Sequence, residues 1–176
     1  MSDSRHTTAD DVYFVTLTVS GWIDLFSRDT YKKILVQNLE HCQKHESLEI
    51  FSYVIMTNHL HMLTRRMDND LNELLGRFKG FTSKEMLKEI QENPKESRKE
   101  WLLHQFKFFA QKNAQYSKYH LWQNKNYPTQ IYSPEVFMQK MNYIHQNPVR
   151  AGILTDPAHY IYSSACPDSP LEMNRW

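Results

Sequence analysis

Two histidines separated by one leucine are the first residues in this sequence that could do chemistry. They are His59 and His61, in a segment 59–65 whose alternating apolar residues predict a β-strand. Residues i and i+2 of a strand face the same way, so both imidazoles can converge on one metal ion while Leu60 anchors the strand in the core. Imidazole is the commonest side-chain metal ligand. Neighbouring histidines also occur by chance on solvent-facing strands, so the pair alone leaves a structural role open.

A tyrosine and an asparagine near the end of the chain form the second candidate pair. Tyr143 and Asn147 are four residues apart in a segment expected to be helical, so they share one side of the helix. A phenol that shares a site with a metal ion can act as a nucleophile, and the Asn147 carbonyl can supply an oxygen ligand. The alternatives are that Tyr143 only packs and that Asn147 only ends the helix before Pro148. A separate apolar stripe on the same segment consists of Phe137, Met141 and Ile144.

Hydrophobic periodicity predicts the elements that position these residues. Strands are expected at 12–19, 48–56, 59–65 and 119–123. Helices are expected from Ser27 or Asp29 to His45, from Asn69 or Asp70 to just before Pro94 with a weak point at Gly80, from Glu96 to Ala114, and from the cap Ser133 to Asn147. This order predicts an α+β fold: a ferredoxin-like sandwich, with an antiparallel sheet and helices packed mainly on one face.

The length of 176 residues suits one domain, with polar residues 1–11 as an N-terminal tail and residues 166–176 as a C-terminal tail. No signal peptide and no membrane-spanning run of about 20 apolar residues is visible, which predicts a cytoplasmic protein that does not use a membrane. The two cysteines, Cys42 and Cys166, form no CxxC pair, which argues against a cysteine-based zinc site.

Positive charge is concentrated in the middle of the chain, although the net charge is only +1. Residues 77–125 hold 11 Lys and Arg against 5 Asp and Glu, and residues 101–134 contain no acid and many aromatic rings. Lysines interleaved with rings suit a single nucleic-acid strand, with ammonium groups on phosphates and rings under bases. Composition alone favours the alternative, a helix with lysines in water and rings in the core. The residues predicted to contact the nucleic-acid strand are Lys79, Lys107, Lys112, Lys118, Trp122, Lys125 and Arg150.

Three segments, in their order along the chain, resemble one known family. They are Met56 to Met62, Leu121 to Gln123, and Tyr143 to Gly152, the last reading Tyr-Ile-His-Gln-Asn-Pro-Val-Arg-Ala-Gly. Together they are similar to the tyrosine transposases of bacterial insertion sequences, most closely the REP-associated subgroup of the HUH single-strand endonucleases. HUH denotes His, a bulky hydrophobic residue and His, which His59, Leu60 and His61 match. The resemblance covers about residues 12–165, which would be the catalytic domain.

The resemblance implies a metal-dependent enzyme that cuts and rejoins hairpin-bearing single-stranded DNA through a covalent 5′-phosphotyrosine. Tyr143 would be the nucleophile, and His59, His61 and Asn147 would hold Mg²⁺ or Mn²⁺. No nucleotide cofactor is needed, because one phosphodiester is exchanged for another. Related insertion-sequence enzymes tend to carry Gln at the place of Asn147, and residues 94–118 are longer and more aromatic than expected of the family.

Other interpretations stay open at this point. The main rival is a non-catalytic single-stranded nucleic-acid-binding module of ferredoxin-like fold, which would not need the histidine pair. A second is a metal-dependent hydrolase with water as the nucleophile. Tyr127 is an alternative nucleophile. His145 is expected to point away from the site, and His104 and His120 to be phosphate-side or packing residues and not metal ligands. The sequence allows either a monomer or a homodimer.

Overall fold

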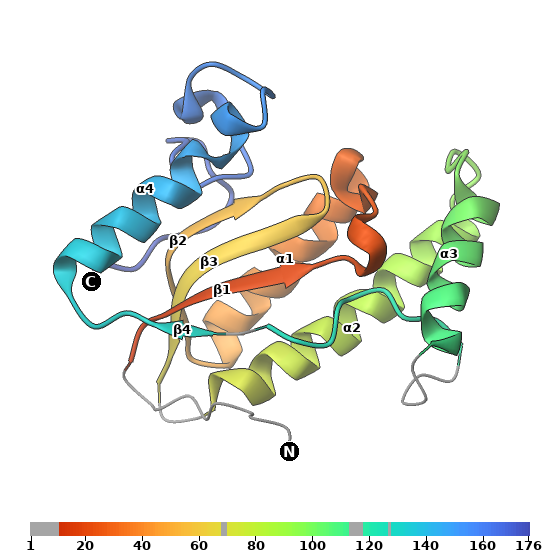
Figure 1. Cartoon of the computed structure of the whole chain (residues 1–176), viewed down its shortest axis with the longest axis horizontal. Helices are drawn as coiled ribbons and strands as arrows, with labels where there is room; N and C mark the ends of the chain where they lie inside the picture. The colour runs from red at the N-terminus through yellow and green to blue at the C-terminus, as the bar shows by residue number, and fades with distance from the viewer. Residues whose placement is uncertain (1–10, 68–69, 113–117, 127) are drawn as a thin grey trace.

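The protein is described by a computed structural model over residues 11–67, 70–112, 118–126 and 128–176 (Figure 1). The strands are β1 (Tyr13–Thr18), β2 (Leu48–Ile55), β3 (His59–Arg66) and β4 (Thr129–Gln130). The α-helices are α1 (Asp29–His45), α2 (Leu71–Glu92), α3 (Lys99–Gln111) and α4 (Pro134–Arg150). Short 3₁₀ helices occupy Ser20–Trp22, Leu25–Ser27 and Pro157–His159.

The strands form one antiparallel sheet in the order β2-β3-β1-β4. With α1 between β1 and β2, and α2 and α3 between β3 and β4, this is the ferredoxin-like arrangement that the sequence predicted. The register places Thr16 opposite His61 and Thr18 opposite His59. The HUH strand β3 is therefore central in the sheet, with β1 on one side and β2 on the other.

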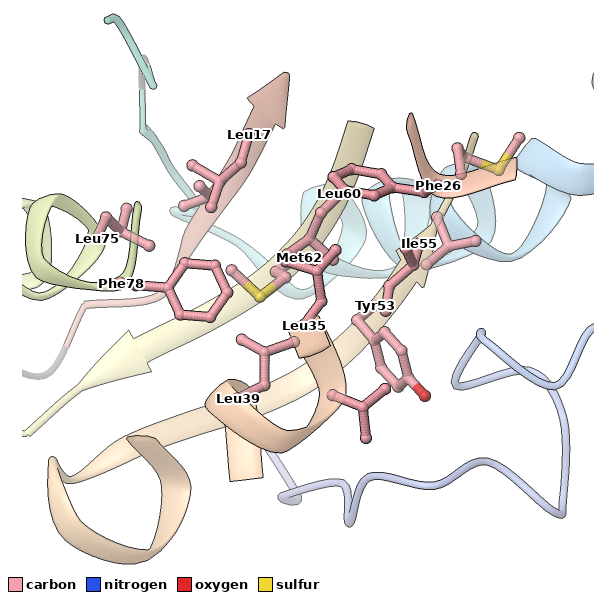
Figure 2. Close-up of a cluster of buried hydrophobic side chains, with 14 of the residues drawn as sticks. Leu17, Phe26, Leu35, Leu39, Tyr53, Ile55, Leu60, Met62, Leu75 and Phe78 are labelled. Carbon is pink, nitrogen blue, oxygen red and sulfur yellow. The ribbon is translucent and has the colours of Figure 1, made fainter. Parts of the chain in front are cut away.

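The two faces of the sheet carry different side chains. One face is apolar, and its residues Leu17, Leu60 and Met62 pack against Leu35 of α1 and Phe78 of α2 (Figure 2). Because side chains alternate along a strand, His59 and His61 point to the opposite face. The prediction of helices mainly on one face is confirmed for α1 and α2, and α4 packs over the β2 and β3 part of the other face.

Several element boundaries differ from the expected ones. Helix α2 runs without a break through Gly80, and α4 continues past Asn147 and Pro148 to Arg150. Proline removes one hydrogen bond of the helix, but Pro148 is buried and the last turn is closed by the Ala151 N–H, which donates to the Asn147 carbonyl. Packing thus outweighs the local preference to end the helix.

The ends of the other helices follow local chemistry only in part. Asp70 and Ser133 cap α2 and α4 through their side chains, as predicted, whereas Arg28 takes the cap position of α1 and makes no side-chain cap bond. Helix α3 begins at Lys99, because the carboxyl of Glu96 is drawn into the interior instead.

Three segments differ from what the sequence predicted. Residues 119–123 form an isolated bridge between Trp122 and Val19 instead of a strand, and the short β4 at 129–130 was not predicted. The segment 166–176, expected to be a tail, packs on the domain: Asn174 exchanges hydrogen bonds with Ile50, and the Trp176 ring stacks on Phe137 at 4.3 Å. Within the described ranges, none of the helices combines the length and apolarity that a membrane crossing requires.

A buried carboxylate ties α1 to the start of α3. Glu96 accepts a hydrogen bond from the Tyr31 hydroxyl at 2.7 Å and forms ion pairs with Arg28 at 3.2 Å and Arg98 at 3.5 Å. Burial raises the pKa of the Glu96 carboxyl, but the Tyr31 hydroxyl, the Arg98 backbone N–H and the two guanidinium groups together lower it below its usual value. The ionised form is therefore the one that stabilises the fold.

We expect Glu96→Gln to lower the free energy of unfolding at pH 7 by about 1–3 kcal/mol, because the Arg28 guanidinium loses its counter-charge and Arg98 keeps only its ion pair with Asp24. A carboxyl with a lowered folded pKa stabilises the fold above its unfolded pKa of about 4.3, and this stabilisation is lost as pH falls through the folded value. Urea unfolding of both proteins between pH 7 and pH 3 measures the difference. A gap that stays constant down to pH 3 would contradict this assignment.

Candidate metal and nucleophile site

The two HUH histidines lie side by side on the sheet face opposite α1 and α2. The ring centroids of His59 and His61 are 4.6 Å apart, and the rings meet edge to face. His61 is buried and His59 is half-buried. The strand therefore does what the i, i+2 spacing predicted, and both imidazoles share one site.

Helix α4 brings Tyr143 to this pair within the same chain. The Tyr143 ring lies 5.4 Å from the His61 ring and 6.0 Å from the Phe14 ring, edge-on to both. Phe14 in turn stacks on His61 at 5.3 Å. The phenol is half-buried, so a substrate can reach it. The alternative nucleophile, Tyr127, lies outside the described residues.

Asn147 faces the histidines from one turn further along α4. Its amide nitrogen donates to the Tyr143 carbonyl at 2.9 Å, and its side chain approaches His59, where hydrogen bonding to it favours the protonated imidazole. One of the two amide N–H donors is used within the helix, and the amide oxygen is the atom that could serve as a metal ligand. The structure thus brings together all the residues predicted to act as nucleophile and ligands.

Both imidazoles are neutral at pH 7. Burial lowers the pKa of His61 to about 3, with further lowering from the charges of His59 and Lys140. Burial also lowers the pKa of His59, which the hydrogen bond with Asn147 raises in part. Metal ligation requires the neutral form of histidine, so the site is in the correct charge state.

The outer nitrogens of the rings are held by partners that the sequence did not reveal. His59 Nδ1 bonds to Asn58 Oδ1 at 2.6 Å, and because that oxygen can only accept, Nδ1 carries the hydrogen. His61 Nδ1 bonds to the Thr16 hydroxyl at 2.8 Å. Such partners fix the ring orientation of metal-binding histidines and leave the Nε2 lone pair for the ion. Asn58 is the neighbour of His59 in the sequence. Thr16 is 45 residues from His61, and only the pairing register of β1 with β3 brings the two together.

This donor set fits a divalent ion that keeps open positions. Two Nε2 atoms and one amide oxygen leave coordination sites for water and for phosphate oxygens, which suits Mn²⁺ and is acceptable to Mg²⁺. Among the described residues, no group of three or more His, Cys, Asp or Glu side chains could hold a metal. Asn147 is the oxygen donor that the structure places beside the histidine pair.

Two cations of α4 flank Tyr143. The Arg150 guanidinium lies 5.4 Å from the centre of the Tyr143 ring, and Lys140 Nζ lies 5.9 Å from it and 4.6 Å from the centre of Phe14. Arg150 was predicted to contact DNA, whereas Lys140 was missed. Its position three residues before Tyr143 puts it on the same side of the helix, which is a signal that the spacing rule could have used.

A hollow of about 510 Å³ extends from the site along β1. It is lined by Phe14, Thr16 and Thr18, by residues 123–126 and by Thr129. Lys125, predicted to contact DNA, is exposed on this wall. The hollow is therefore next to the histidines on the part of the sheet that α4 leaves uncovered.

The other predicted DNA contacts have different surroundings. Lys79 donates from Nζ to the carbonyls of Gln123 and Asn124 and to Asn126 Oδ1, so its three N–H donors hold the wall of the hollow. Trp122 is 3% exposed, with its indole N–H bonded to Thr82, so its ring belongs to the core and is not presented to a base.

The lysines of the α3 region remain on the surface. Lys107 and Lys112 are exposed on α3 and at its end, and Lys118 is exposed beyond it. The opposite side of α3 buries Leu102, Phe106 and Ala110, which is the amphipathic helix that composition favoured.

Three further histidines lie away from the pair, as predicted for His145. His145 bonds to Ser52 and Ser164, His120 bonds to Asn124, and His104 is exposed on α3.

We expect Thr16→Val to weaken Mn²⁺ binding about 10-fold or more, because the substitution keeps the shape of the side chain but removes the partner of His61 Nδ1. Isothermal titration calorimetry of the metal-free protein measures this. Thr18→Val, two residues along the same face, is the matched control and should bind Mn²⁺ like the unaltered protein. Equal affinity in Thr16→Val and Thr18→Val would show that the hydroxyl does not orient His61.

Comparison with known proteins connects this geometry to one family. No curated protein matches the sequence. A solved structure described as a REP-associated tyrosine transposase bound to a REP hairpin superposes with a TM-score of 0.63 at 15% identity, covering 93% of this chain and 82% of that chain. At this identity the similarity shows the shared fold. Residues 23–111, which include both histidines, match the family described as IS200-like transposase. The chain therefore belongs to the IS200-like transposase family.

Proposed function

We propose that the protein is a metal-dependent endonuclease and strand transferase for single-stranded DNA, with Tyr143 as its nucleophile. The observation that carries this proposal is the meeting of Tyr143 with the histidine pair: rings 5.4 Å apart for Tyr143 and His61, and 4.6 Å apart for His61 and His59. Membership of the transposase family supports the same chemistry.

The proposed reaction exchanges one ester of phosphate for another. The Tyr143 oxygen forms a bond to phosphorus, the bond from phosphorus to the 3′ oxygen breaks, and the phenolic proton ends on that 3′ oxygen. The products are a 5′-phosphotyrosine and a free 3′-OH. Attack by a 3′-OH on the phosphotyrosine reverses these changes and rejoins a strand, so no nucleotide hydrolysis is required.

Each residue of the site has a proposed role in this exchange. His59, His61 and Asn147 would hold a divalent ion, which when bound polarises the phosphate and stabilises the charge of the transition state. Lys140 and Arg150 lie on both sides of the Tyr143 ring and would attract the phosphate and neutralise its charge. Thr16 and Asn58 would orient the imidazoles.

The hollow along β1 would hold the strand. A phenyl ring, three threonines, three side-chain amides and the Lys125 ammonium line it, which suits the base faces, base edges and phosphates of an unpaired strand. The structural relative is described as bound to a REP hairpin, and we propose that this protein likewise acts on DNA next to a hairpin. Binding without catalysis, the rival interpretation, would use the same hollow but would not need Tyr143.

The first test is formation of a covalent protein–DNA adduct. We expect the protein, with Mn²⁺ and single-stranded oligonucleotides that carry hairpins, to give an adduct that survives SDS. Tyr143→Phe should give none, because the attacking oxygen is missing. Tyr132→Phe, which alters an exposed tyrosine just before α4, is the matched control and should react normally. DNA binding without any adduct would identify a binding module, and an undiminished adduct in Tyr143→Phe would refute the assignment.

A mixing experiment tests whether one chain builds the whole site. Because Tyr143 and His61 of the same chain are in contact, we expect no adduct from a mixture of Tyr143→Phe and His61→Ala proteins. In a dimer that exchanges α4, each chain would supply what the other lacks and the adduct would return. Gel analysis of the mixture at several protein concentrations distinguishes the two, and restored activity would contradict a site built within one chain.

A further inference from the structure

A large aromatic ring stands exposed next to the metal-binding pair. The Trp22 side chain is 61% exposed, and its ring lies 6.3 Å from the His59 ring at an angle of 72°. Because His59 pairs with Thr18, this ring stands at the Thr18 end of the hollow. Exposed tryptophans cover neither core nor interface in a free chain, so a ring in this place is available to a ligand.

The backbone holds Trp22 in a conformation that bulky residues rarely adopt. Gly21 has φ 66° and Trp22 has φ 57°, both in the left-handed region. The Trp22 N–H donates to the Val19 carbonyl at 3.0 Å, and the Trp22 carbonyl accepts from Asn58 Nδ2 at 3.2 Å. The surrounding structure therefore imposes this conformation, which is common at ligand sites.

The same asparagine connects the ring to the metal site. Asn58 donates to the Trp22 carbonyl through its amide nitrogen and accepts from His59 Nδ1 through its oxygen at 2.6 Å. One side chain thus sets the positions of both the Trp22 turn and the His59 imidazole. A ligand that touches the Trp22 ring would lie at a fixed place relative to the ion.

Helix α3 supports the turn from behind. A Cβ on Gly21 would lie 2.3 Å from Cζ of Phe109, so Phe109 packs directly against the glycine backbone. The Ser20 N–H donates to the Leu121 carbonyl at 2.8 Å, which ties the turn to the segment after α3. Phe109, in the described part of the region 94–118, thereby acquires a structural role.

We propose that Trp22 is a stacking platform for one unpaired nucleobase of the DNA strand, next to the phosphate that Tyr143 attacks. This inference rests on the proposed function and adds a base-binding subsite to it. Every nucleobase has a π-face that an exposed indole can cover, so the subsite would accept any base. Stacking there would fix the strand at the Thr18 end of the hollow and so place one phosphate over the histidines.

Abasic substrates test this directly. In a Tyr143→Phe protein, which cannot react, each nucleotide near the cleavage point is replaced in turn by an abasic residue and the Kd is measured with Mn²⁺ present. We expect one position to weaken binding about 5- to 150-fold, the range for loss of one stacked base. Adding Trp22→Asn should abolish this penalty, so that intact and abasic strands bind within about 2-fold of each other.

The choice of variants keeps the result interpretable. Asparagine tolerates the left-handed backbone, so Trp22→Asn removes the ring without disturbing the turn, and Trp22→Phe should keep most of the penalty. Trp101→Ala, which removes another exposed tryptophan, is the control and should keep all of it. An abasic penalty that persists unchanged in Trp22→Asn would overturn the subsite.

The two proposals fail in different ways. If Trp22→Asn changes nothing while the unaltered protein still forms the adduct, the stacking subsite is wrong and the enzymatic function stands. If the Trp22-dependent penalty is found but the unaltered protein forms no adduct, the base subsite stands and the nucleophile assignment fails.

Discussion

The imidazole of His61 is contacted by residues from several elements of the fold, and the site depends on these contacts. Thr16 fixes its Nδ1, the Phe14 ring stacks on one side, and the Tyr143 ring meets it from α4. Burial keeps this imidazole neutral, so the lone pair of its Nε2 is available to a metal ion at physiological pH. The sheet, α4 and β1 must all hold their places for this contact to exist.

The ferredoxin-like fold holds the elements around His61 in place. Its apolar face is closed by α1 and α2, which leaves the other face for polar chemistry. Helix α4 covers only the β2 and β3 side of that face and so carries Tyr143 to the histidines while the β1 side stays open as a hollow. Trp22, just after β1, stands beside His59 at one end of this hollow. Residues 123–126, before β4, form its wall and are held by Lys79.

Local spacing predicted the parts of the site that lie within single elements. The i, i+2 pair of β3 and the i, i+4 pair of α4 follow from strand and helix geometry. Thr16, Phe14 and Trp22 could not be found this way, because their contacts depend on strand register and on a turn. The prediction that Trp122 contacts DNA was wrong, because an indole can stack on a base or fill a core. Here the ring is buried and its N–H donates to the Thr82 hydroxyl. Strand β4 has only two residues, too few to show an alternating pattern in the sequence. Pro148 lies within α4 because packing outweighs its preference to end the helix.

The most direct measurement of the central claim is mass spectrometry of the adduct after protease and nuclease digestion. The site described above predicts a nucleotide joined through its 5′ phosphate to the peptide that contains Tyr143, with fragment ions placing the added mass on that residue. The same mass on another tyrosine, such as Tyr127, or a link through a 3′ phosphate would contradict it.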